Sequence, residues 1–235
     1  MDKQLVLTAL KDLRAKSDKK FSQSIDLQIR LKEIDIKKQD QKIDLYMSLP
    51  HSLGKKKTIV GFVDAQLGAQ AKTVFDTVIL KKDFAKYAKD KKFQKKLASA
   101  HDYSVAQLEL MSTFAATFGK VFGPKGKMPN PKAGCVVPGT AQLAPLVHKL
   151  QNTIHLQTKN DEVIRTVVGT DKMKDEELAD NIIAIYNTLL TKLPQEKNNI
   201  KDIIVKLSMG PAYILGSGFK NLDQTEVKKQ KVTKK

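Results

Sequence analysis

The spacing of hydrophobic residues changes twice along the chain, and this change restricts the possible folds more than any other feature. Apolar and polar residues alternate over Ile25–Leu31 and Ile43–Leu49, which is typical of strands with one face in solvent. From Thr58 to Ala106, short apolar runs instead alternate with stretches long enough for helices. The alternation of apolar and polar residues returns after Thr153. We therefore expect one domain built from both chain ends and a different domain inserted between them.

The outer segments predict an antiparallel α+β domain made of residues 1–54 and 153–215. Its expected helices have apolar residues at helical spacing, and its expected strands alternate apolar with polar residues. Besides the two strands above, the expected elements are helices over Leu5–Leu13 and Asp175–Leu190 and strands over Ile154–Gln157, Val163–Val168 and Ile200–Leu207.

The middle segment, residues 55–152, predicts an α/β domain with a parallel sheet covered on both faces. Such an insertion needs two chain crossings, near residues 52–57 and 150–153, and a paired crossing is a natural hinge. The expected elements are strands over Thr58–Val63, Thr77–Leu80 and Tyr103–Ala106 and helices over Lys82–Ala100 and Leu110–Lys120.

The charge of the chain favours a polyanionic partner. It has 42 Lys and Arg against 25 Asp and Glu, a formal net charge of +17, which exceeds what solubility requires. Nucleic acid is the first expectation and an anionic membrane surface the second. No apolar run approaches the roughly 20 residues of a spanning helix, and the first residues do not resemble a signal peptide. We expect an intracellular protein, and the single Cys135 is interpreted as a small packed residue.

A glycine- and proline-rich segment, GPKGKMPNPKAG at Gly123–Gly134, predicts a shaped loop rather than a helix or strand. Its glycines suggest a phosphate cradle, but Pro124, Pro129 and Pro131 have no N–H to offer, and no Ser or Thr follows Lys127. A rigid lysine-bearing loop against RNA or another protein, and a purely structural loop, both remain open.

Two short segments have the residue types of RNA contacts. Lys20, Phe21 and Ser24 combine a cation, an aromatic face and a small hydroxyl before and at the first strand. At the end of the last strand, the segment Ser208–Pro211 breaks the alternation, and its glycine could allow close approach of another backbone. A core Phe and an edge bulge are the alternative interpretations of these segments.

The sequence indicates no enzyme, and we expect no cofactor and no metal. The four histidines are scattered, without metal-site spacing, and neither a serine elbow nor a dinucleotide fingerprint occurs. The lysine-rich tail, residues 216–235, has few large apolar residues and is expected to be disordered without a partner.

Three motifs in this order and spacing resemble the signatures of the ribosomal protein L1 family, in particular its archaeal members. They are SLPHSLGK at Ser48–Lys55, the Gly123–Gly134 segment, and SMGP at Ser208–Pro211. KKFSQS and KMKDEELADNI fit as well, so the resemblance covers roughly Met1–Leu215. Ser52 departs from the glycine that is common in the family and could stiffen the first crossing.

The resemblance implies a discontinuous RNA-binding domain with a Rossmann-like three-layer α/β domain inserted into it. It also implies a cytoplasmic, ribosome-associated protein, monomeric when free, that binds large-subunit ribosomal RNA at the mobile stalk near the tRNA exit site. Assisted release of deacylated tRNA and repression of its own mRNA are further implied roles. The rRNA-binding residues that it suggests are Lys20, Phe21, Ser24, Lys159, Arg165, Ser208, Met209 and Gly210.

Two alternatives compete with this interpretation. One is a nucleotide- or phosphate-binding enzyme with its site at the Gly123–Gly134 loop, since ligands favour the ends of parallel strands. The other is a basic RNA chaperone without sequence preference, which would bind unrelated RNAs equally well.

Overall fold

The structure, a computed structural model, describes residues 1–17, 19–35, 38, 41–88, 90–158 and 161–219. The chain divides into two compact units. Unit 1 combines residues 1–55 with the chain that follows Thr153, and unit 2 is Lys56–Thr153. The main sheet of unit 1 is antiparallel and that of unit 2 is parallel, so the predicted fold class is confirmed.

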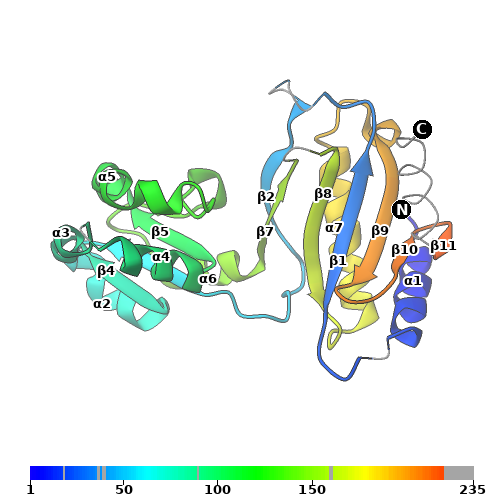
Figure 1. Ribbon diagram of the computed structural model, residues 1–235, viewed down its shortest axis with the longest axis horizontal. Helices are drawn as coiled ribbons and strands as arrows, with labels where there is room; N and C mark the ends of the chain where they lie inside the picture. The colour runs from blue at the N-terminus through cyan, green and yellow to red at the C-terminus, as the bar shows by residue number, and fades with distance from the viewer. Residues whose placement is uncertain (18, 36–37, 39–40, 89, 159–160, 220–235) are drawn as a thin grey trace, which may run out of the picture. The chain divides into compact units, whose positions relative to one another are not determined.

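The main sheet of unit 1 is built around the strand that follows the first helix (Figure 1). Its order is β11-β10-β9-β1-β8, and all its pairings are antiparallel. β2 and β7 form a separate two-stranded sheet. The strands are β1 (Ser24–Leu31), β2 (Asp44–Ser48), β7 (Thr153–Gln157), β8 (Val163–Thr170), β9 (Ile200–Leu207), β10 (Ala212–Ile214) and β11 (Gly218–Phe219).

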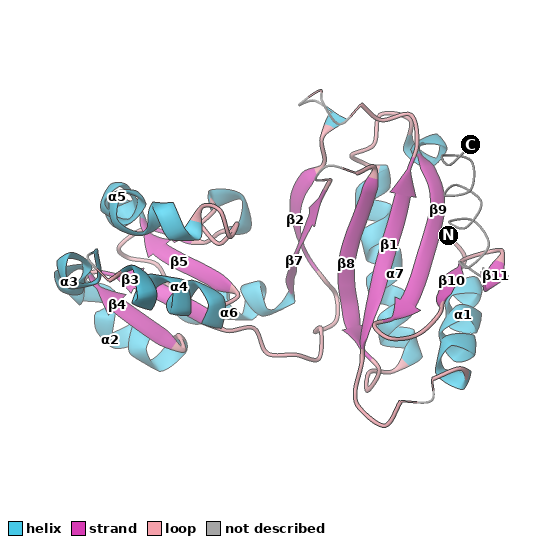
Figure 2. Ribbon diagram, in the orientation of Figure 1, coloured by secondary structure: helices cyan, strands magenta, loops and turns pink. Residues whose placement is uncertain are grey.

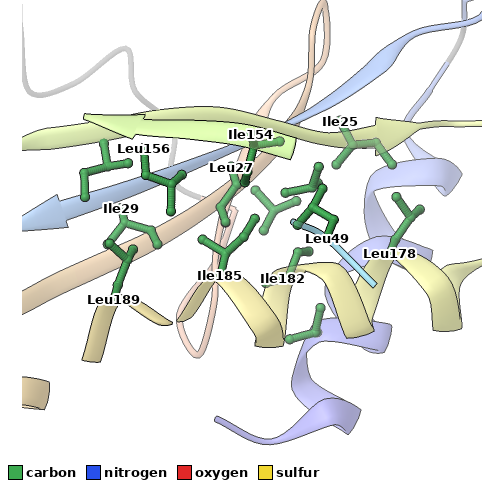
Figure 3. Close-up of a cluster of buried hydrophobic side chains, with 14 of the residues drawn as sticks. Ile25, Leu27, Ile29, Leu49, Ile154, Leu156, Leu178, Ile182, Ile185 and Leu189 are labelled. Carbon is green, nitrogen blue, oxygen red and sulfur yellow. The ribbon is translucent and has the colours of Figure 1, made fainter. Parts of the chain in front are cut away.

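The core of unit 1 lies between this sheet and the helices α1 (Lys3–Ala15) and α7 (Asp175–Leu190). Every second residue of β1 is buried, as the alternation predicts. Figure 3 shows the side chains of β1 and β7 facing the apolar stripe of α7. Burying one Leu or Ile side chain contributes about 1.5–3 kcal/mol. The side chains labelled there are Ile25, Leu27, Ile29, Leu49, Ile154, Leu156, Leu178, Ile182, Ile185 and Leu189.

Asn181, which is fully buried on α7, fastens two neighbouring segments of unit 1. Its Nδ2 donates to the carbonyl of Val168 at 3.0 Å and to that of His51 at 3.3 Å. Its Oδ1 accepts from the backbone N–H of His51 at 3.0 Å. A buried amide is tolerated because its hydrogen bonds are made, and these bonds hold the segment after β2 against the end of β8.

Unit 2 is a three-layer α/β domain (Figure 2). Its parallel strands have the order β4-β3-β5-β6. Helices α3, α4 and α5 pack on one face, and α2 and α6 pack together on the other. The elements are β3 (Ile59–Val63), α2 (Ala65–Val74), β4 (Thr77–Leu80), α3 (Phe84–Ala88), α4 (Lys91–Ala100), β5 (Tyr103–Gln107), α5 (Met111–Phe122), β6 (Val136–Val137) and α6 (Leu143–Asn152).

A cluster of phenylalanines fills the first of these two faces. The ring of Phe62 on β3 lies 4.6 to 6.0 Å from the rings of four others. All four contacts are edge-on or tilted, the geometry that aromatic quadrupoles favour. The four are Phe84, Phe114, Phe118 and Phe122.

Two sequence expectations are corrected by the structure. The single helix expected over Lys82–Ala100 is broken, because the carboxylate of Asp90 caps α4 by accepting from the N–H of Phe93. The tail does not begin at residue 216, because Gly218 and Phe219 form β11 beside β10. The ammonium of Lys16 lies 3.5 Å from the centre of the Phe219 ring, a cation–π contact. Residues 220–235 lie outside the described residues.

The two chain crossings are fastened to each other within unit 2. The amide of Gln151 pairs with both backbone groups of Lys57, at 2.8 and 2.9 Å. The carbonyl of Thr153 accepts from the Tyr103 hydroxyl and from the ammonium of Lys57. Burial lowers the pKa of Lys57 to about 8, although nearby Asp102 opposes the shift. The residues that enter and leave unit 2 thus share one set of hydrogen bonds.

We expect Phe62→Ala to destabilise unit 2 by about 3–5 kcal/mol, because it removes the ring at the centre of the cluster and leaves a cavity. Urea unfolding monitored by circular dichroism measures this change. Leu108→Ala is the control, since Leu108 is 64% exposed and should have little effect. Equal stability of the two variants would contradict the assigned core.

Candidate nucleic-acid interface

Three chain segments meet at one end of the unit 1 sheet. β1 runs antiparallel to both β8 and β9, so the residues before β1 lie beside the residues after β8 and β9. In Figure 1 this is the lower end of the sheet. We call residues 20–24, 171–173 and 208–210 the three-loop patch.

Gln23, only 3% exposed, connects the three segments. Its Oε1 accepts from the backbone N–H of Met209 at 3.0 Å, and its Nε2 donates to the Ser17 hydroxyl at 3.2 Å. Its backbone N–H donates to the Asp171 carboxylate at 3.0 Å, and its carbonyl accepts from the Asp171 N–H at 2.9 Å. Four hydrogen bonds from one residue therefore fix the relative positions of these segments.

Asp171 is the second organising residue of the three-loop patch. The hydroxyl of Ser22 donates to it at 2.6 Å. This bond lowers the pKa of Asp171, and the backbone N–H of Gln23 and the charges of Arg14 and Lys172 lower it further. Arg14 also donates to the Asp171 carbonyl at 2.6 Å. The carboxylate is therefore held in its charged form as a structural acceptor.

Exposed apolar side chains project from the backbone that Gln23 and Asp171 hold in place. Phe21 is 54% exposed and Met209 is 68% exposed, and Lys20 beside Phe21 is also exposed. The backbone N–H and the hydroxyl of Ser208 both donate to the Ser24 carbonyl, at 3.0 and 3.2 Å. An aromatic ring, a thioether and a cation so presented can stack on bases and contact phosphate.

The structure brings six of the eight suggested rRNA-binding residues to the three-loop patch. The atoms nearest Gly210 belong to its own turn and not to another segment of the chain. A Cβ on Gly210 would lie 3.1 Å from the Cβ of Leu207, within the same turn. The six are Lys20, Phe21, Ser24, Ser208, Met209 and Gly210.

The other two suggested residues are not part of the three-loop patch. Arg165 lies in β8 opposite Gln28, four residues along β1 from Ser24, which is about 13 Å at the rise of a strand. It is exposed and pairs with Asp161 at 3.3 Å. Lys159 lies outside the described residues.

Sequence reasoning missed Gln23, Asp171 and Arg14. Nothing near Gln23 in the sequence distinguishes it from a surface glutamine, because its partners lie 148 and 186 residues away. The position of Asp171 directly after β8 is a weak signal, since Asp often bonds to backbone where a strand ends.

The Gly123–Gly134 loop stabilises unit 2 itself. Lys125 donates to the carbonyl of Lys95 and to the hydroxyl of Ser99, both within α4. Lys127 donates to the carbonyl of His101, the residue that ends α4, where a positive charge is favoured. The carbonyl of Lys127 accepts from Ser104 near the start of β5. The loop is thus at the amino edge of the parallel sheet, whereas ligands bind such sheets at the carboxyl ends of the strands. This position counts against the nucleotide-binding interpretation.

Other parts of the described chain offer no competing chemistry. Burial raises the pKa of the Cys135 thiol to about 11, so this cysteine is protonated and unreactive at neutral pH. The described residues contain no cluster of three or more His, Cys, Asp or Glu side chains suited to a metal ion. None of the described helices is long and apolar enough to cross a membrane.

Comparison with known proteins agrees with these features. Residues 13–211 match the model of the ribosomal protein L1p/L10e family. The "Large ribosomal subunit protein uL1" of Methanothermococcus thermolithotrophicus is 38% identical over 90% of this chain and 97% of its own length. The proteins of the same name from Methanocaldococcus jannaschii and Pyrococcus abyssi are 36% and 35% identical, over 100% and 90% of this chain and 100% and 95% of their own lengths. The chain therefore belongs to the ribosomal protein L1p/L10e family.

Proposed function

We propose that this protein is a structural constituent of the large ribosomal subunit and binds large-subunit rRNA at the mobile stalk near the tRNA exit site. The observation that carries the proposal is the exposure of Phe21 and Met209 on loops held together by buried Gln23. Large exposed apolar side chains on a rigid backbone are typical of interaction sites. The family consists of ribosomal proteins and not of enzymes.

Charge and shape have different tasks in this proposal. A net charge of +17 attracts any RNA through its phosphates, an interaction that weakens as salt rises. Charge alone cannot choose among RNAs, because every RNA has the same backbone. The three-loop patch supplies the selection by presenting Phe21, Met209 and small hydroxyls at fixed positions.

We further propose the finer family roles for this chain. Unit 2 moves as a body relative to RNA-bound unit 1 and assists the release of deacylated tRNA. Two chain crossings fastened at Lys57 and Gln151 favour a defined hinge over free tumbling. An mRNA segment that resembles the rRNA element would compete for the three-loop patch, which provides a route to repression of the protein's own translation.

Competition binding tests the main proposal. Stalk-region rRNA and a scrambled RNA of equal length are measured at two salt concentrations. We expect a clear preference for the stalk RNA that persists at the higher salt. Equal affinities would support the chaperone alternative and overturn the proposal.

The substitution Met209→Asp should abolish the preference for stalk RNA, because it places a carboxylate where a thioether contacts RNA. Affinity for scrambled RNA should fall much less. In contrast, Lys20→Ala should weaken both RNAs and lower the salt slope by about one unit or less. An equal loss on both RNAs from Met209→Asp would refute the assignment of the three-loop patch.

A second substitution tests the role of the buried amide. Gln23→Ala leaves the N–H of Met209 without its acceptor and should cost about 1–3 kcal/mol in stability. We expect stalk-RNA binding to fall while scrambled-RNA binding is retained. Gln4→Ala, which removes an exposed glutamine of α1 away from the loops, is the control. If the folded Gln23→Ala variant bound stalk RNA with unchanged affinity, the position of these loops would have no role in RNA selection.

A further inference from the structure

A small cavity lies in unit 1, separate from the three-loop patch. Its volume is about 170 Å³, well below the roughly 300–1,000 Å³ of pockets for drug-sized ligands. β7 pairs with β2 and β8 pairs with β1, and the cavity lies between β7 and β8. Its lining residues are His155, Gln157, Asp161, Val163 and Arg165.

The cavity opens on the side of β7 and β8 that turns away from the core. Ile154 and Leu156 of β7 are buried in the core, whereas His155 and Gln157 between them are half-buried. Because strand residues alternate between faces, these two side chains point to the other side. Arg165 is exposed on that same side, so the cavity can be reached from solvent.

One wall of the cavity is the imidazole ring of His155, which two neighbouring side chains hold in place. The rings of His155 and Tyr46 are stacked, with centroids 4.1 Å apart and planes 5° from parallel. The Nε2 of His155 also lies 2.6 Å from a carboxylate oxygen of Asp44. Both partners come from β2, on the side of β7 away from β8. The imidazole is therefore held in one orientation, and it also lines the cavity.

The opposite wall supplies a cation. Arg165 pairs with Asp161 through two contacts of 3.3 and 3.4 Å, and both side chains are exposed. Exposed ion pairs contribute little stability, so the guanidinium can turn toward a phosphate, which it binds in a bidentate manner. The flat ring could stack on a nucleobase, and the guanidinium opposite it could bind the phosphate of the same nucleotide.

We propose that this cavity receives a single unstacked nucleobase of the bound RNA. The base stacks against His155, the Gln157 amide bonds to its edge, and Arg165 holds the adjoining phosphate. This inference rests on the proposed function and adds to it a second contact, on a different part of unit 1. It also assigns Arg165 a role that the three-loop patch does not explain.

The test uses the full chain, with the stalk-region rRNA fragment as probe. His155→Ala should weaken binding about tenfold, because it removes the stacking surface. His155→Phe should restore most of the affinity, since it keeps a flat ring. His148→Ala, which removes an exposed histidine of α6, is the matched control and should bind normally. Circular dichroism spectra verify that each variant is folded.

Nuclear magnetic resonance of the histidine rings distinguishes contact with a base from a purely structural role of His155. RNA should shift the ring protons of His155 through the ring current of the stacked base. Inorganic phosphate alone should leave them in place while it perturbs the Arg165 side chain. If phosphate reproduces the RNA effect at His155, or if His155→Phe binds no better than His155→Ala, the cavity holds no base.

The same spectra separate this inference from the proposed function. Shifts at Phe21 and Met209 without any at His155 would overturn the nucleobase site and leave the proposed function standing. Absence of shifts at all three positions would overturn both.

Discussion

Strand β1 receives hydrogen bonds on both edges, from β8 and from β9, and the organisation of unit 1 depends on this pairing. The register places alternate residues of β1 in the core. It also places the chain before β1 beside Asp171 and Met209. A slip of one residue would turn Ile25, Leu27 and Ile29 toward solvent, and the same slip would separate Gln23 from Met209. The core and the three-loop patch are therefore specified by one alignment of strands.

Buried polar groups then hold the loops at the ends of these strands in fixed positions. Gln23 and Asn181 each join segments that are far apart in sequence, and their hydrogen bonds are strong because little water competes for them. Phe21 and Met209 can remain exposed in fixed positions because the backbone beneath them is fastened. A rigid apolar surface loses little conformational entropy on binding, which favours selective recognition over general attraction.

Local patterns were sufficient to predict much of the fold. α7 and β9 have the bounds that their periodicity predicted, since each carries its buried face in its own sequence. The break before α4 was missed because the Asp90 cap is a single side-chain bond within a lysine-rich helical pattern. For the candidate site, residue types and family resemblance suggested Phe21 and Met209, but the role of Gln23 depends on partners brought close only by the fold. The separation of Arg165 from the three-loop patch likewise follows from strand register.

The discontinuous architecture has a consequence for biosynthesis. Strand β1, with its apolar face, leaves the peptide tunnel early, yet both of its neighbours are encoded beyond unit 2. At about 5–20 residues per second, the nascent chain exposes unpaired β1 edges for roughly 7–35 seconds. Unit 2 is contiguous and can fold during that interval, whereas unit 1 can close only when nearly the whole polypeptide has emerged. Abundant lysines near β1 disfavour aggregation during this delay, so charge that attracts RNA in the mature protein also protects it while it is being made.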